Sequence, residues 1–162
     1  MLIEFNLPTV DVKHLNVLVR ALCALDVMYL RANPNTPRLK ESGVRYANQP
    51  RGCERFLTVP AILAKGNADC DQLAPWRAAE LRVRDGIQAL PEVRRMSENL
   101  WHVFVRMPDG SVEDISAHLG MRVPESLARI GRAIIERKRR ESTSHPYRAA
   151  LAGFDLQARR RR

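Results

Sequence analysis

Candidate chemistry in this sequence centres on Cys70, which lies between two aspartates in the segment GNADCDQLAPWRAAELR. Asp69 fits the N-cap of a helix and Gln72 completes a capping box, so the pattern predicts Cys70 at the first helical position. Backbone N–H groups at a helix N-terminus carry about half a positive charge and favour a thiolate. Asp69 and Asp71 oppose ionisation. We therefore expect a nearby imidazolium to outweigh the two carboxylates and activate the Cys70 thiol.

The leading candidate for that imidazolium is His102, in the segment NLWHVFVRMPDGSVEDIS. Two alternating runs around Pro-Asp-Gly predict a β-hairpin. Pro108 suits the second position of a type I turn, and Gly110 supplies the left-handed residue of a three-residue loop with a bulge. The predicted register therefore pairs Met107 with Ser111.

This register selects the acid that would orient His102. His102 faces Ser116, Phe104 faces Asp114, and His102 and Asp114 become diagonal neighbours on one face, within side-chain reach. Glu113 points to the opposite face, and a slip of one residue would exchange the two acids.

A nucleophile on a helix, a base on a strand and an acid on the next strand follow the Cys-His-Asp logic of acyl transfer. We expect Cys70 to attack an amide carbonyl, His102 to act as base and then as acid, and Asp114 to hold His102. The oxyanion hole would include the Cys70 backbone N–H, and the sequence does not identify its second donor.

The order of these residues, and the strings GVRYANQPRGCERFLTVPAILAKGNADCDQLAPWRAAELR and WHVFVRMPDGSVEDIS, resemble the transglutaminase-like superfamily. This is a branch of the papain-like fold, and the resemblance is to its small members encoded by tailed bacteriophages. It covers about residues 43–121. It implies a cysteine peptidase or amide acyl transferase that acts on a protein or peptide substrate, in the bacterial host cytoplasm or in the virion. Hydrolysis and transfer to an amine both remain open.

A non-enzymatic alternative also follows from the resemblance, because many members of this superfamily have lost catalysis. The chain would then be a virion structural or assembly protein that contacts DNA or partner proteins through its basic tail.

The sequence pattern predicts the elements that must position these residues. Together they indicate an α+β fold in which helices pack on a small antiparallel sheet. A first helix spans about Asp11 to Ala32, and residues 33–69 are irregular with short extended pieces in GVRYA and RFLTVP. A second helix begins near Asp69 or Cys70 and carries an apolar stripe as far as Leu90, where Pro91 limits it. The last helix covers about residues 124–140. The apolar stripe of the first helix consists of Val12, Leu15, Val19, Leu22, Leu25, Met28 and Tyr29.

Other candidate residues receive more ordinary interpretations. Cys23 and Trp76 are expected in the core, and Cys53 is expected to be incidental. His118 is a fallback base that is more typical of a surface or capping residue, and Trp101 could roof the site beside His102. A metal site built from Cys53, Cys70, His102 and His118 has no recognisable ligand spacing, so no metal or other cofactor is expected.

Composition restricts the class of protein. The 162 residues are 45% hydrophobic and 28% charged, which is typical of a globular protein. No apolar run is long enough for a membrane span, so we expect no membrane partner. The N-terminal segment has no basic region followed by a cleavage site, which favours a cytoplasmic protein. Three cysteines without a CxxC pair argue against a disulfide framework.

Charge divides the chain into an expected catalytic domain, residues 1–121, and a basic helix and tail, residues 122–162. The second part holds twelve Arg and Lys against four acidic residues, a net +8 of the total +9. Such a cluster favours phosphate backbones without sequence specificity, so nonspecific nucleic acid is one candidate partner. An acidic surface of a virion protein is another.

Overall fold

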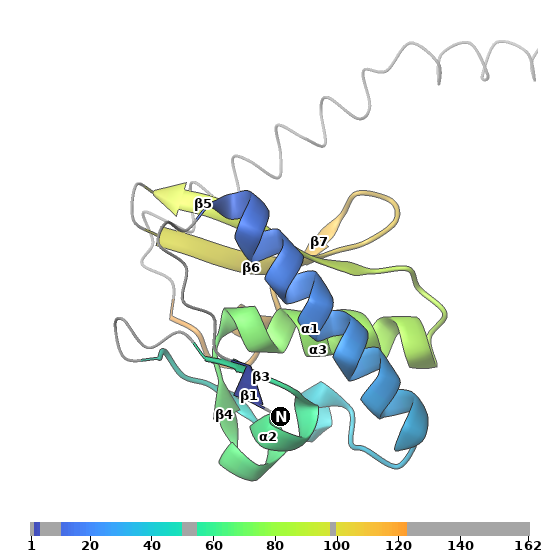
Figure 1. Cartoon of the computed structure of the whole chain (residues 1–162). Helices are drawn as coiled ribbons and strands as arrows, with labels where there is room; N and C mark the ends of the chain where they lie inside the picture. The colour runs from blue at the N-terminus through green and yellow to red at the C-terminus, as the bar shows by residue number, and fades with distance from the viewer. Residues whose placement is uncertain (1, 4–10, 50–54, 98–99, 123–162) are drawn as a thin grey trace, which may run out of the picture. The chain divides into compact units, whose positions relative to one another are not determined.

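The computed structural model describes residues 2–3, 11–49, 55–97 and 100–122 (Figure 1). The chain divides into two units, Met1–Val123 and Pro124–Arg162, and all described residues belong to the first. Cys53, the expected last helix and the basic tail therefore lie outside the described residues.

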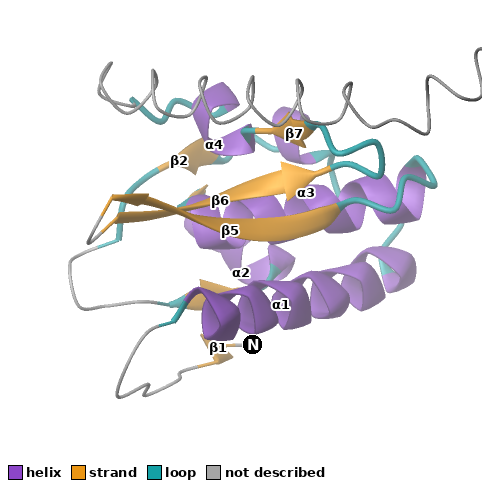
Figure 2. Cartoon of the chain, turned by 90° about the horizontal axis from the view of Figure 1, so that it is seen from above, coloured by secondary structure: helices purple, strands orange, loops and turns teal. Residues whose placement is uncertain are grey.

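The described part of the chain has the expected α+β composition with a small antiparallel sheet. The sheet has the order β5-β6-β7, formed by Leu90–Ser97, Leu100–Arg106 and Val112–Glu113. Helices α1 (Val12–Ala32) and α3 (Cys70–Arg84) pack against each other. Helix α1 also packs on β5 and α3 on β6, and Figure 2 shows α3 running behind these strands. No described helix is long and apolar enough to cross a membrane.

Shorter elements connect these layers. Two pairs of short strands are described: β1 with β3, antiparallel, and β2 with β4, parallel. Strands β2 and β3 confirm the extended pieces expected in GVRYA and RFLTVP, whereas helix α2 lies in a segment that was expected to be irregular. The bounds are β1 Leu2–Ile3, η1 Leu39–Glu41, β2 Arg45–Tyr46, β3 Phe56–Leu57, α2 Val59–Lys65, β4 Asn67–Ala68 and α4 Ile115–His118.

Helix α1 begins where the sequence predicts, because Asp11 is its N-cap and accepts a hydrogen bond from the Lys13 backbone N–H. Its buried face differs from the expected apolar stripe. Met28 is 67% exposed, whereas Asp26 is completely buried. The carboxylate of Asp26 has a structural task there, since its Oδ1 accepts a hydrogen bond of 3.0 Å from the Val59 N–H at the start of α2.

Helix α3 begins at Cys70, as the sequence predicts, and runs through Pro75 to Arg84. The expected extension to Leu90 is wrong. Gly86 has φ +68°, a conformation that favours glycine, and it turns the chain out of the helix. Leu90 and Pro91 then belong to β5, a strand that the sequence does not predict.

The hairpin of β6 and β7 has the predicted register. Val105 pairs with Glu113, and the Met107 N–H donates to the Ser111 carbonyl at 2.8 Å. Gly110 has φ +85°, as the predicted loop requires. One expectation is wrong: β7 ends at Glu113, so Asp114 is not a strand residue but the N-cap of α4.

Candidate active site

His102 and Asp114 are neighbours in space. His102 is a β6 residue that is 8% exposed, and its Nε2 lies 3.1 Å from Oδ2 of Asp114. The separation is that of a hydrogen bond, although the Nε2–H direction departs from the line to the carboxylate. The other carboxylate oxygen, Oδ1, accepts a hydrogen bond of 3.1 Å from the Ala117 N–H. One oxygen of Asp114 therefore caps α4 while the other faces the imidazole.

Asp114 is held in its ionised form. Burial alone would raise its pKa, but the contact with His102 and the backbone N–H groups of Ala117 and Ser116 outweigh burial, and the pKa is lowered overall. A carboxylate that stays charged can orient an imidazole and stabilise its protonated form.

The imidazole of His102 is also held by an aromatic neighbour. The ring of Phe104, two residues along β6, lies edge-to-face with it at 4.5 Å between centroids and an interplanar angle of 87°. With Nε2 next to the Asp114 carboxylate, Nδ1 is the nitrogen of His102 that could exchange a proton with a nucleophile.

Cys70 is placed by the elements that precede α3. Helix α2 ends at Gly66, whose φ of +76° reverses the chain, and β4 then leads directly into Asp69 and Cys70. Asp69 is the N-cap residue, but its side chain makes no cap hydrogen bond, so the expected capping box is not formed. The Gln72 side-chain amide instead donates to the carbonyl of Arg55. Cys70 itself is partly exposed.

The free edge of β6 faces the Cys70 sulfur. On this strand the Met107 N–H points towards β7, and every second residue points its N–H the same way, so Val103 does too. Strand β7 has already ended at Glu113, which leaves this part of the edge without a strand partner. The Val103 N–H forms a hydrogen bond with the Cys70 thiol. The nucleophile candidate is thus joined to the residue that follows His102.

The expectation of an activated, easily ionised thiol is wrong for the structure as it stands. The pKa of the Cys70 thiol is raised, first by burial and then by the charges of Asp71 and Asp69. The hydrogen bond from Val103 lowers it but does not compensate, and Asp114 raises it further. The Cys70 side chain is therefore a neutral thiol at rest.

Tyr46 belongs to the same site and was not singled out in the sequence. Its pKa is raised, first by burial and then by electrostatic interaction with the neighbouring acidic groups of Cys70, Asp69, Asp71 and Asp114. The parallel pairing of β2 with β4 places Tyr46 opposite Ala68, just before α3. No sequence spacing signals this long-range pairing. The Tyr46 hydroxyl lies 2.5 Å from Oδ1 of Asn48.

Buried polar atoms without hydrogen-bond partners accumulate in the segments that form the site. Among the described residues they include Oδ1 of Asp69, Oε1 of Gln72 and Oγ of Ser116. Buried polar atoms without partners are rare in protein interiors. A bound ligand or a catalytic role is one kind of explanation for them.

The remaining candidates lie at the periphery or in the core. His118 is exposed at the end of α4, and Trp101 is partly exposed with the Arg95 guanidinium 5.3 Å from its ring centroid. Cys23 and Trp76 are fully buried, as expected. In the described part of the chain, no group of three or more His, Cys, Asp or Glu side chains could hold a metal ion.

No protein-family model, curated protein or solved structure matches this chain.

Proposed function

We propose that this protein is a transglutaminase-like cysteine hydrolase or amide acyl transferase, with Cys70 as nucleophile, His102 as base and Asp114 as the residue that orients His102. The observation that carries the proposal is the 3.1 Å contact between His102 and Asp114, directly beside the position on β6 whose N–H reaches the Cys70 sulfur. A helix-borne cysteine, a histidine on a strand and an acid after the next strand also support a papain-like arrangement.

The reaction would begin from a neutral thiol, since burial and two carboxylates raise the pKa of Cys70. His102 takes the thiol proton as sulfur attacks the amide carbonyl carbon, and the imidazolium is stabilised by Asp114. The Cys70 N–H, at the first position of α3, has no acceptor within its helix and can donate to the oxyanion. Collapse breaks the C–N bond, and the departing amine leaves with the proton from His102.

The thioester on Cys70 is then released by a second nucleophile. Attack by water gives a free acid and completes hydrolysis, and attack by an amine gives a new amide. In either case His102 removes a proton from the attacking group, and the thiol is restored. The substrate class we propose is a protein or peptide amide, and phage particles are the proposed setting.

A second candidate, a non-enzymatic virion protein with the same fold, is favoured by one observation. The raised pKa of the Cys70 thiol is the opposite of what an ion-paired catalytic cysteine needs at rest.

Iodoacetamide labelling of Cys70, followed by peptide mass spectrometry, tests the enzymatic proposal. Substitution His102→Ala should slow labelling at neutral pH, because the base that removes the thiol proton is gone. The matched control is His118→Ala, which removes an exposed histidine and should leave the rate unchanged. Equal rates in both variants would contradict the assignment of His102 as base.

A further inference from the structure

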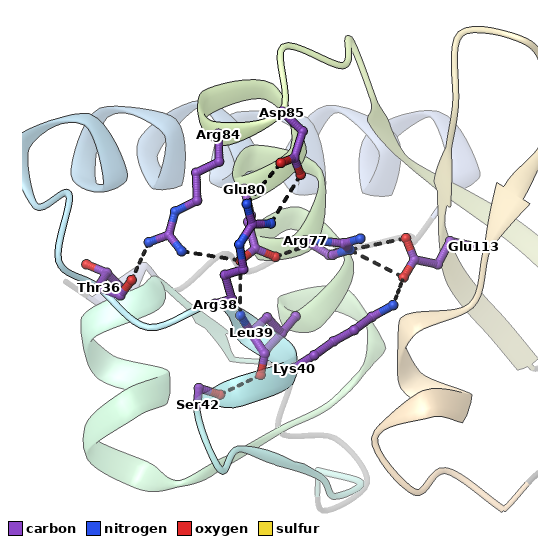
Figure 3. Close-up of polar contacts among 10 residues, drawn as sticks. All are labelled: Thr36, Arg38, Leu39, Lys40, Ser42, Arg77, Glu80, Arg84, Asp85 and Glu113. Atoms are coloured by element: carbon purple, nitrogen blue, oxygen red, sulfur yellow. Dashed lines mark hydrogen bonds and ion pairs between the residues drawn. The ribbon is translucent and has the colours of Figure 1, made fainter.

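A network of ion pairs links the η1 segment, α3 and β7 (Figure 3). At one end, Arg38 pairs with Asp85 at 3.0 Å, and both side chains are substantially exposed. At the other end, Glu113 of β7 accepts from Arg77 of α3 and from Lys40. The two ends anchor different elements. The Arg38–Asp85 pair contacts the C-terminus of α3, and the contacts of Glu113 anchor the strand that leads to Asp114.

The contacts at Glu113 are short and largely buried. Arg77 Nε lies 3.1 Å from Oε2 and 3.3 Å from Oε1 of Glu113, and Lys40 Nζ lies 2.8 Å from Oε1. The side chains of Arg77 and Glu113 are 14% and 13% exposed. Burial alone would raise the pKa of Glu113, but Lys40 and Arg77 outweigh it and lower the pKa overall.

The guanidinium of Arg77 is fixed from its other side as well. Its Nη1 lies 2.8 Å from Oε2 of Glu80, a residue that is 1% exposed. Oε1 of Glu80 in turn accepts from the Leu39 N–H at 3.2 Å. Arg77 therefore has little freedom to leave Glu113, because both of its ends are engaged by buried carboxylates.

Position along the helix and the strand connects this clamp to the candidate site. Arg77 follows Cys70 by seven residues, which is close to two helical turns, so the two share one face of α3. Glu113 immediately precedes Asp114, but the two side chains have separate partners. Glu113 contacts Arg77 and Lys40, whereas Asp114 contacts His102. The ion pair thus ties the helix that carries the proposed nucleophile to the strand that leads directly into Asp114, the proposed orienting acid.

Strand β7 needs such an anchor. It has two residues and pairs with β6 only through Val105–Glu113 and Arg106–Val112. So short a ladder leaves the strand end poorly fixed by backbone hydrogen bonds alone.

We propose that Arg77 and Glu113 are positioning residues, which hold Asp114 in the place from which it orients His102. The inference rests on the proposed function, because it assigns a task within the same catalytic group. Neither residue touches the reacting atoms, so their effect passes through Asp114.

The test compares Glu113→Gln with Asp85→Asn, which breaks the exposed ion pair at the other end of the network. Glu113→Gln should slow iodoacetamide labelling of Cys70 on the order of tenfold at neutral pH, since misplacing reacting groups by about 1 Å can cost about 100-fold. It should also shift the imidazole N–H signal of His102 in ¹H–¹⁵N NMR spectra of the full chain, assigned by its absence in His102→Gln. Asp85→Asn should change neither measurement.

A double variant separates positioning from a general structural effect. If Glu113 acts through Asp114, adding Glu113→Gln to Asp114→Asn should alter labelling by less than about twofold. The same tenfold slowing in both backgrounds, or no slowing beyond that of Asp85→Asn, would overturn the proposal. Should Glu113→Gln fail to fold, Arg77→Lys replaces it, because lysine keeps the charge but loses the forked geometry.

The NMR signal also keeps this inference distinct from the proposed function. An unreactive Cys70 in the unaltered chain would contradict the proposed function, whereas the response of the His102 signal to Glu113→Gln still confirms or overturns the positioning.

Discussion

At Cys70 the protein combines a helix N-terminus, which favours a thiolate, with a partly buried side chain and two neighbouring carboxylates, which oppose it. The opposing effects are larger, and the pKa of the thiol is raised. A cysteine in this state needs a base during the attack rather than a pre-formed ion pair. His102 is the base we propose, because it precedes Val103, whose N–H interacts with the Cys70 sulfur.

Removing one of the neighbouring charges should make Cys70 more reactive. Substitution Asp71→Asn removes the largest charge effect on the thiol and should lower its pKa, so labelling by iodoacetamide at pH 7.5 should accelerate about tenfold, for about one pKa unit. Glu41→Gln removes an equal charge from an exposed residue of η1 and is the control. Labelling that is no faster in Asp71→Asn than in Glu41→Gln would show that burial alone suppresses the thiolate.

Asp114 has two tasks that substitutions can separate. Asparagine keeps an acceptor for the Ala117 N–H and is as good an N-cap as aspartate, so Asp114→Asn should leave the free energy of unfolding nearly unchanged. It should still slow turnover and Cys70 acylation, because the neutral amide no longer orients or stabilises the imidazolium. Asp114→Ala should lose the cap as well, at about 1 kcal/mol of stability by urea unfolding. Equal stability losses in both variants would contradict the division of tasks.

Part of the site could be predicted because local chemistry determines it. Pro108 and Gly110 determine the hairpin loop, and the loop determines the register that selects Asp114 over Glu113. The sign of the thiol pKa shift could not be predicted, since desolvation depends on packing that the sequence does not display. Tyr46 was missed because its neighbours come from a long-range parallel pairing.

At the scale of elements, α2 is attached to α1 by a buried carboxylate. Thr58 is the N-cap of α2, but its side chain makes no cap hydrogen bond, and Asp26 of α1 accepts from the Val59 N–H instead. Burial raises the pKa of Asp26 from 3.8 to about 7, with the Val59 hydrogen bond opposing the shift. The folded chain therefore retains a proton that the unfolded chain releases.

This proton makes stability depend on pH. Because the folded pKa is raised, the contribution of Asp26 is fully present below about pH 4 and is lost as the pH rises through about 7. The loss by pH 8 should be about 4 kcal/mol, at 1.36 kcal/mol per pKa unit. Asp26→Asn keeps an acceptor for Val59 but cannot ionise, so urea unfolding should show a smaller decline from pH 4 to pH 8. The control Asp11→Asn alters an exposed helix cap, and a decline in Asp26→Asn as steep as in this control would contradict the prediction.

Elements were predictable where the signal is local and sustained. Helix α1 has a 21-residue pattern with an N-cap, and it begins and ends where the pattern does. Strand β5 was missed because LPEVRRMS carries a proline and three charges, although its burial alternates once α1 covers its edge. There the Asn16 side chain accepts from the Val93 N–H, a contact between residues far apart in the sequence.

At the scale of the whole molecule, charge is the clearest asymmetry. Residues 122–162 carry a net +8, and residues 1–121 carry only +1. Any affinity for polyanions should therefore reside in the basic region. If about six of its side chains contact phosphates, the slope of log K against log salt on duplex DNA should be roughly −5, without preference for base sequence.

Deletion of residues 141–162 tests this division. It removes five arginines and two acids, a net +3, so the salt slope should become shallower in fluorescence anisotropy titrations. The labelling rate of Cys70 should stay the same. Two results would contradict the proposed separation of a catalytic domain from a basic C-terminal region. One is tight binding that does not depend on salt concentration, and the other is a deletion that abolishes labelling of Cys70.

Acyl transfer to the Cys70 sulfur is the most direct measure of the central claim. The chain is mixed with 4-nitrophenyl acetate, quenched in acid and mapped by mass spectrometry, while nitrophenolate release is followed by absorbance. We expect a burst of nitrophenolate with one acetyl group on Cys70, no burst in Cys70→Ala, and a strongly slowed burst in His102→Ala. Acetylation that avoids Cys70, or that proceeds at the same rate without His102, would contradict it.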